Sequence, residues 1–101
     1  MYMRSDCINP YCTYITSNPG RTAFYTGVTN NLKRRMSEHL QNRGNRKTFA
    51  GRYFCYEPVY YECYPYLTAA IWREKEIKLF KRDRKVALIK SKNPGKMKLI
   101  P

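Results

Sequence analysis

A short run of turn-forming residues, Ser17 to Gly20, separates two segments rich in strand-forming residues, and this arrangement most constrains the fold. The segments 11–16 and 22–28 contain many β-branched and aromatic residues, which favour strands. Proline and glycine in the turn favour chain reversal, and Gly20 is free to adopt a positive φ. The sequence therefore predicts an antiparallel hairpin with a loop of about five residues.

A helix is predicted directly after the hairpin. Asn31 can accept hydrogen bonds from the unpaired N–H groups at a helix start. Apolar residues recur at helical spacing between Leu32 and Leu40, so we expect a helix over residues 31–42, with Gly44 as its stop.

The second half of the chain is expected to add a strand and a further long helix. The strand covers 59–63, and Pro58 confines it to a sheet edge or to a strand start. Thr68 is expected to cap the helix, which runs to about residue 81. Residues 43–53 are predicted to be basic and irregular, and the segment from residue 82 a short helix with a loosely packed end.

These elements indicate one α+β domain: a three-stranded antiparallel sheet flanked by helices, in the order β-β-α-β-α with a short C-terminal helix. The chain of 101 residues has room for a single domain. We expect this domain over 11–94, preceded by an N-terminal extension, 1–10, and followed by a C-terminal tail, 95–101.

The charge of the chain indicates a polyanionic partner. Twenty lysines and arginines against seven acidic residues give a net charge of +13. Such a field attracts polyanions, and binding through several phosphates depends strongly on salt. A ribosomal protein, or a surface that is basic for solubility, is the alternative interpretation of this composition.

Membranes and secretion are not indicated by the sequence. No segment approaches the roughly 20 apolar residues needed to span a bilayer. Residues 1–10 lack the basic-then-apolar order of a secretion signal. We therefore expect a cytoplasmic protein whose partner is nucleic acid, DNA first of all, with no membrane and no obligate protein partner.

The four cysteines are expected to be reduced thiols in that compartment. Four residues separate Cys7 from Cys12 and seven separate Cys55 from Cys63, which is not the close pairing of zinc modules. The chain has a single histidine, which further disfavours a zinc cage. Buried thiols that pack as small hydrophobic side chains are the favoured interpretation.

One carboxylate interrupts the apolar stripe of the second long helix. Glu74 follows the helical spacing of Ala70, Ile71 and Ile77. A carboxylate among apolar residues must take up a proton or find a partner. A structural ion pair, or a boundary glutamate whose tip reaches water, explains this position as well as a functional carboxylate does.

The first helix and the hairpin contribute the other polar candidates. Arg35 and His39 are four residues apart, so they share a helix edge near the sheet. A guanidinium there would bind phosphate or pair with Glu74, whereas a packing role is favoured for His39 taken alone. Tyr14 and Tyr25 are expected to share a sheet face, which a register slip of one residue would reverse.

Together these residue types fit phosphodiester hydrolysis. A divalent metal on the glutamate would polarise the phosphate and stabilise the leaving oxygen. A tyrosine would accept a proton from water once nearby cations or the metal favour the phenolate, because an unperturbed phenol has a pKa of ~10. The arginine would neutralise charge that accumulates on the phosphate.

The motifs in these segments resemble those of the GIY-YIG nuclease family. Residues 24–35 read FYTGVTNNLKRR and are followed by Glu38 and His39, which is similar to the YIG strand and the helix after it. Residues 69–78 read AAIWREKEIK and resemble the helix that carries the family's glutamate. The order of motifs matches over roughly 11–94, and the nearest subgroup is the small, stand-alone bacterial members.

The chain departs from the family pattern at both name-giving triplets. It has CTY at residues 12–14 and YTG at 25–27, so each triplet keeps its tyrosine and the second keeps its glycine. Val28 stands where some members have a lysine, which leaves water activation less assisted.

The resemblance implies a role for each candidate residue. Tyr25 would act as general base, and Tyr14 would orient water or phosphate. Arg35 would contact the scissile phosphate, and His39 would assist it or hydrogen-bond a tyrosine. Glu74 would bind a single Mg²⁺ or Mn²⁺.

Two further positions are expected to support the site. Gly27 offers a place where the backbone can approach closely, and Asn93 resembles a late asparagine in some family members. The implied activity is a metal-dependent endonuclease that hydrolyses phosphodiester bonds in DNA, with structured or single-stranded nucleic acid as expected substrate forms.

Exposed basic residues are predicted to contact the nucleic acid, mainly its phosphates. Phe49 and Tyr53 lie among them and would stack on the bases of unpaired strands. A flexible loop that is basic for solubility is the alternative. The predicted contacts are Lys33, Arg34, Arg43, Arg46, Lys47 and Arg52.

Two other classes of function stay open. The first is a nucleic-acid-binding module that has the GIY-YIG fold without catalysis, although the filled chemical positions argue against it. The second is a protein–protein adaptor for an acidic partner, for which the net charge of +13 is suited.

Overall fold

Three strands form an antiparallel sheet in the computed structural model, which describes residues 9–99. β1 (Tyr11–Ser17) is central, and β2 (Phe24–Thr29) and β3 (Glu57–Tyr64) are its neighbours on either side. The predicted hairpin and third strand are confirmed, and Pro58 lies on an edge strand as expected. The proline pairs with Thr16, next to an irregularity in the β1–β3 register.

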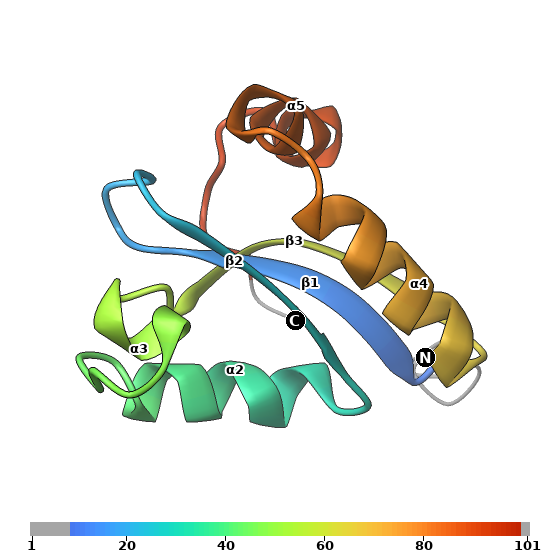
Figure 1. Cartoon of the computed structure of the whole chain (residues 1–101), viewed down its shortest axis with the longest axis horizontal. Coiled ribbons are helices and arrows are strands. Elements are labelled where there is room, and N and C mark those ends of the chain that lie inside the picture. The colour runs from blue at the N-terminus through green and yellow to red at the C-terminus, as the bar shows by residue number, and fades with distance from the viewer. Residues whose placement is uncertain (1–8, 100–101) are drawn as a thin grey trace.

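Helices cover both faces of the sheet (Figure 1). α2 (Leu32–Gln41) and α3 (Phe49–Arg52) lie on one side, and α4 (Leu67–Lys78) and α5 (Arg82–Lys92) lie on the other. α4 packs against all three strands. The predicted α+β class, a three-stranded antiparallel sheet flanked by helices, is confirmed.

The expected cap is confirmed for α2 and is wrong for α4, and α3 is a capped helix that the sequence did not predict. Asn31 caps α2, because its side-chain oxygen accepts a hydrogen bond from Arg34 N at 3.0 Å. Thr68 does not cap α4, which begins one residue earlier without a side-chain cap. α3 lies in the segment predicted to be irregular; it is too short for helical periodicity, and the side chain of Thr48 caps it at Gly51 N.

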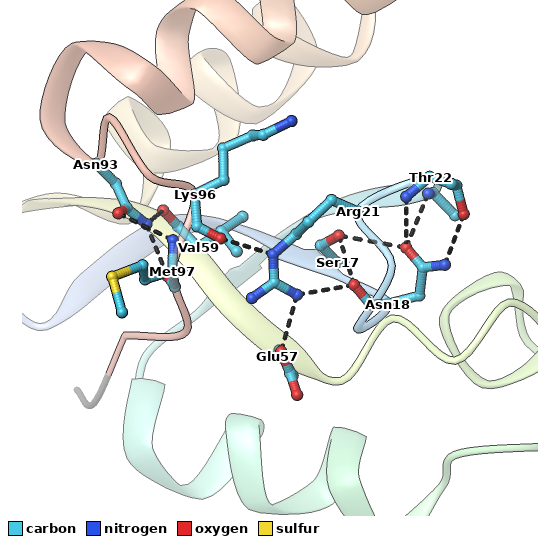
Figure 2. A network of polar contacts seen from close by, with 10 residues as sticks. Ser17, Asn18, Arg21, Thr22, Glu57, Val59, Asn93, Lys96 and Met97 are labelled. Carbon is cyan, nitrogen blue, oxygen red and sulfur yellow. Dashed lines mark hydrogen bonds and ion pairs between the residues drawn. The ribbon is translucent and has the colours of Figure 1, made fainter.

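The hairpin turn adopts its positive φ at Arg21 and not at Gly20, which corrects the expectation. A non-glycine residue with φ of 58° is uncommon, and tertiary contacts hold this one in place (Figure 2). The Arg21 guanidinium donates to Lys96 O at 2.6 Å and to Asn18 O and Glu57 Oε1, both at 2.8 Å. The turn therefore depends on the C-terminal segment, which sequence proximity does not show.

The hydrophobic core contains buried residues from the sheet and from both α4 and α5. Ile15 and Val59 belong to the sheet, Ile77 to α4 and Ile89 to α5, and all four are fully buried. This packing explains why residues 82–92 form a complete helix and not only the short one predicted.

The segment after α5 is attached to the sheet, which corrects the expectation of a loosely packed end. Leu99 N donates to Pro58 O at 2.7 Å. The Asn93 side chain donates to Val59 O at 3.0 Å and to Met97 O at 2.7 Å, and accepts from Met97 N at 3.1 Å (Figure 2).

Two of the four cysteines form a disulfide, so the expectation of reduced thiols is wrong for this pair. Cys12 and Cys63 are direct partners on β1 and β3 and are joined by the bond. Directly opposed residues on neighbouring strands have close Cβ atoms, a proximity that the linear spacing cannot show. Cys55 is a buried free thiol whose pKa is raised to about 11 by burial, and Cys7 lies outside the described residues.

Within residues 9–99, the helices are too short or too polar to cross a bilayer.

Candidate functional site

The two tyrosines of the hairpin share one face of the sheet, as predicted. Tyr14 pairs with Gly27, and Tyr25 pairs with Thr16. Opposed residues and residues two apart point to the same face, so both rings lie on the α2 side. Their ring centroids are 6.3 Å apart.

Gly27 provides the space that these rings occupy. A Cβ atom added at this residue would lie 2.5 Å from the Tyr14 hydroxyl oxygen and 3.0 Å from Cε2 of Tyr25. Both separations are shorter than ordinary van der Waals contact. The close neighbours of Gly27 are therefore the rings of Tyr14 and Tyr25, and the close approach of a backbone there stays a prediction.

α2 places two polar side chains against the Tyr14 hydroxyl. His39 Nε2 lies 2.8 Å from Tyr14 Oη, and Arg35 Nε donates to the same oxygen at 3.3 Å. The His39 ring also packs edge-on against Tyr25, at 5.5 Å between centroids. His39 and Met36 form the buried face of α2, whereas Leu40 of the expected apolar stripe is 43% exposed.

Burial sets the protonation of this cluster. Burial first, and then the positive charge of Arg35, lower the pKa of His39 to about 4, so its imidazole is neutral at pH 7. Burial raises the pKa of Tyr14 to about 12, so its phenol keeps its proton. The direction of the hydrogen bond between Tyr14 Oη and His39 Nε2 follows the imidazole tautomer: with the ring proton on Nδ1, the Tyr14 phenol donates to Nε2.

Arg35 is held at two of its three guanidinium nitrogens. Nε binds Tyr14, and Nη1 donates to Glu38 Oε1 at 3.0 Å, so the predicted alternative of pairing with Glu74 is not adopted. Within the part of the chain that the structure describes, Nη2 has no hydrogen-bond partner. That nitrogen is available to an oxygen of a bound phosphate.

A small pocket of about 140 Å³ brings three of the predicted residues together. Tyr25, Arg35 and His39 line it with residues from the α3 region, of which Phe49 is the largest. Tyr14 is only 1% exposed and contacts this pocket through Arg35 and His39. It is therefore placed to position these side chains and not to touch phosphate itself.

Phe49 was assigned from the sequence only to the basic surface, and not to this pocket. Its ring stacks on that of Tyr25, with centroids 6.3 Å apart and planes inclined by 28°. No linear motif connects it to the hairpin tyrosines, since α3 is a single short turn of helix.

Glu74 belongs to α4, which lies on the face of the sheet opposite to α2 (Figure 1). Its side chain is 19% exposed, and Lys78 Nζ lies 2.9 Å from Oε2. Ala70 and Ile77 on the same stripe are fully buried, so Glu74 lies at the boundary of the core. Burial dominates the raised pKa of Tyr14, and the negative charge of Glu74 adds the smallest contribution.

The position of Glu74 fits a divalent cation of the Mg²⁺ type. Such ions are held by one or two carboxylates and complete their octahedral shell with waters and substrate phosphate oxygens. Among residues 9–99, no three or more acidic, histidine or cysteine side chains cluster, which disfavours a fully protein-enclosed site. A partly exposed carboxylate of this kind meets the looser requirement.

Asn93 does not join this cluster. Both of its amide hydrogens and its oxygen are used by backbone groups of β3 and the C-terminal segment. The residue secures the end of α5, and its supporting contribution to the site stays a prediction.

The predicted nucleic-acid contacts all lie on the surface. Every residue from Leu40 to Phe49 is exposed, and this segment follows α2 directly. Phe49 and Tyr53 are 52% and 47% exposed, with ring centroids 4.7 Å apart. The predicted cations, each exposed, are Lys33, Arg34, Arg43, Arg46, Lys47 and Arg52.

Comparison with known proteins connects this arrangement to a family. The model of the GIY-YIG catalytic domain matches residues 10–87. A UPF0213 protein of Haloquadratum walsbyi is 38% identical over 66 residues, which cover 65% of this chain and 72% of that protein. No solved structure matches the chain significantly.

Proposed function

This chain belongs to the GIY-YIG family, and from that premise we propose that it is a metal-dependent endonuclease that hydrolyses phosphodiester bonds in nucleic acid. The observation that carries the proposal is the convergence of Tyr25, Arg35 and His39 on one pocket, with Tyr14 buried behind them. The net charge of +13 supports a polyanionic substrate.

In the proposed reaction, Arg35 binds the scissile phosphate through Nη2. Tyr14 and Glu38 hold the other two nitrogens, so the guanidinium needs little reorganisation when charge develops on the phosphate. Tyr14 and His39 are positioning residues in this scheme, because Tyr14 holds Arg35 and His39 holds Tyr14.

Tyr25 is the proposed general base. It lines the pocket, and its ring is held between those of His39 and Phe49. In the phenolate form, which nearby cations or the metal would favour, its oxygen beside a bound phosphate would accept the proton of the attacking water and become a phenol. His39 is neutral at pH 7, so it adds no competing positive charge at this point.

Glu74 is the proposed metal ligand. A Mg²⁺ or Mn²⁺ ion bound there supplies Lewis-acid stabilisation of the phosphate and of the leaving oxygen. Lys78 neutralises the carboxylate in the ion-free protein, at 2.9 Å.

Binding is proposed to depend on phosphates and on the shape of the substrate, with little reading of base sequence. The exposed cations of α2 and of the segment after it suit backbone contacts. DNA is the proposed substrate, in structured or single-stranded form.

A cleavage panel tests the proposal. Single-stranded, flapped and branched DNA and the matching RNAs are incubated with Mg²⁺ or Mn²⁺, using the natural protein and its Glu74→Gln variant. We expect metal-dependent cleavage that Glu74→Gln abolishes while binding persists. Glu76→Gln is the matched control, because Glu76 lies on the same helix but pairs with Arg73, and it should cleave normally.

Two results would contradict the proposal that the chain is an enzyme. If the natural protein binds these substrates and cuts none of them, the chain is a binding module. If this chain shows no affinity for nucleic acid but binds a partner protein in a complex that survives nuclease treatment, the chain is an adaptor.

A further inference from the structure

Phe49 lines a second pocket beside the one that holds Tyr25 and Arg35. The second pocket has a volume of about 420 Å³. That size lies in the range of roughly 300–1,000 Å³ typical of small-molecule sites, whereas the first pocket is smaller. One aromatic ring therefore separates the candidate reaction centre from a larger binding space.

The second pocket lies beside the start of the edge strand β2. Tyr53 and Phe49 come from the α3 side, Phe24 from the start of β2, and Lys85 from α5 on the other side (Figure 1). β2 is an edge strand, so nothing in the sheet closes this space. A chain-like ligand can therefore pass from one side of the sheet to the other.

The aromatic lining offers stacking surfaces. The rings of Phe49 and Tyr53 are 4.7 Å apart, and each residue is about half exposed, at 52% and 47%. Phe24 and Phe80 complete the lining. Exposed aromatic side chains bind nucleobases by stacking without regard to sequence, since every base has a π-face.

The polar lining is cationic. Arg82 and Lys85 contribute to the pocket, and none of the acidic residues between 9 and 99 lines it. Arg82 is oriented by a hydrogen bond to Thr22 O at 2.8 Å, and its guanidinium carbon lies 5.2 Å from the centroid of the Phe24 ring. Two cations beside four aromatic rings match a ligand with a planar apolar part and a negative charge.

We propose that this pocket binds an unpaired nucleotide of the substrate strand, next to the bond that is cleaved. The base stacks on Phe49 and Tyr53, and the phosphate is bound by Arg82 and Lys85. The adjacency to the cleaved bond rests on the proposed function, whereas the binding itself does not. A paired nucleotide does not fit this description, because its faces are covered by its neighbours in the duplex.

Binding without metal tests the inference apart from cleavage. Fluorescence anisotropy is measured in EDTA with labelled oligothymidylate of about 12 nucleotides, the uridine RNA of equal length, and an abasic DNA strand of equal charge. The natural protein should bind the base-bearing strands at least about fivefold more tightly than the abasic strand. The two base-bearing probes distinguish DNA from RNA as the preferred source of the nucleotide.

Variants locate the effect in the pocket. Tyr53→Leu should remove most of the preference for base-bearing strands, and Arg82→Gln should weaken binding of the base-bearing and abasic strands alike. Trp72→Leu is the control, because this tryptophan is 73% exposed on α4 and lies outside the pocket. It should leave all affinities unchanged, and thermal unfolding confirms that each variant is folded.

Equal affinity of the natural protein for abasic and base-bearing strands overturns the inference, as does a full preference in folded Tyr53→Leu. Cleavage combined with equal affinities would leave the enzyme proposal intact and reject this pocket. A preference for base-bearing strands that depends on Tyr53, without any cleavage, would support this pocket and reject the enzyme proposal.

Discussion

The hydroxyl of Tyr14 lies 2.8 Å from Nε2 of His39, which joins the central strand of the sheet to α2. Arg35 Nε donates to the same hydroxyl from the preceding turn of the helix. One buried phenol thus connects the guanidinium at the pocket to an imidazole that is kept neutral. This contact and the burial around it have measurable consequences.

The pKa of His39 is the first of these consequences. The chain has one histidine, so its imidazole signals in an NMR titration are unambiguous. We expect a pKa of about 4, against about 6.5 for an exposed histidine, because the ring is buried beside Arg35. Arg35→Gln should raise this value. An unshifted pKa in the folded protein would contradict the described packing.

The lowered pKa of His39 also predicts that the fold weakens on acidification. Between pH of about 6.5 and 4 the unfolded chain binds a proton that the folded protein does not bind. The contribution of His39 to the free energy of unfolding should therefore be constant above this pH window. It should fall as the pH drops through the window, by as much as about 3 kcal/mol. Urea unfolding at several pH values measures the slope, and His39→Gln should flatten it. An identical slope in that variant would assign the loss to other groups.

Gly27→Ala should damage both stability and activity. The new methyl group would lie 2.5 Å from the Tyr14 hydroxyl, so the tyrosine or the strand must move. Overpacking of this kind costs about 1–3 kcal/mol, and the displaced Tyr14 would no longer hold Arg35. Gly20→Ala is the matched control: its methyl group meets only an ordinary contact at 3.8 Å, so unfolding and cleavage should change little. Similar losses in both variants would argue against a steric role of Gly27.

Lys78→Gln should reduce the concentration of Mg²⁺ needed for half-maximal cleavage. The lysine lies 2.9 Å from the Glu74 carboxylate and competes with a cation for it. The pair is partly exposed, with 49% of the lysine side chain accessible, so we expect a change of only a few fold. Lys75→Gln removes the same charge from the neighbouring helix surface and serves as control. A metal requirement that both variants change equally would indicate a general charge effect.

The Cys12–Cys63 disulfide should be detectable by thiol counting. Without reductant, thiol labelling of the denatured protein should modify Cys55 and spare Cys12 and Cys63, and reduction should expose both of them. The bond closes a loop with a sequence separation of 51, so its reduction should lower the free energy of unfolding by about 2–4 kcal/mol. Cys55→Ser leaves the bond in place and should lower only the thiol count. Four reactive thiols without reductant would restore the interpretation of reduced cysteines that a cytoplasmic location favours.

Local patterns in the sequence predicted most of the fold. The hairpin, the capping of α2 by Asn31 and the edge position of Pro58 each depend on residues close in sequence. α3 escaped prediction because four residues show no helical period, and α5 was predicted too short because Ile89 is buried by distant residues.

The site was only partly predictable for the same reason. Tyr14, Tyr25, Arg35 and His39 were each identified as chemical candidates, and their order along the chain matched a known family. The sequence could not show that Tyr14 would be sealed inside the cluster, since burial depends on what α2 and the sheet cover together.

Contacts between residues close in the chain account for the three strands, for α2 and α4 and for the chemical groups that they carry, because side-chain periodicity and capping act between neighbouring residues. Long-range packing sets Tyr14 opposite Gly27 and Cys12 opposite Cys63, and it lets Asn93 secure the C-terminal segment. These relationships depend on strand register and on packing between segments far apart in the chain. A shift of register by one residue would keep every local preference and turn each side chain to the other face of the sheet.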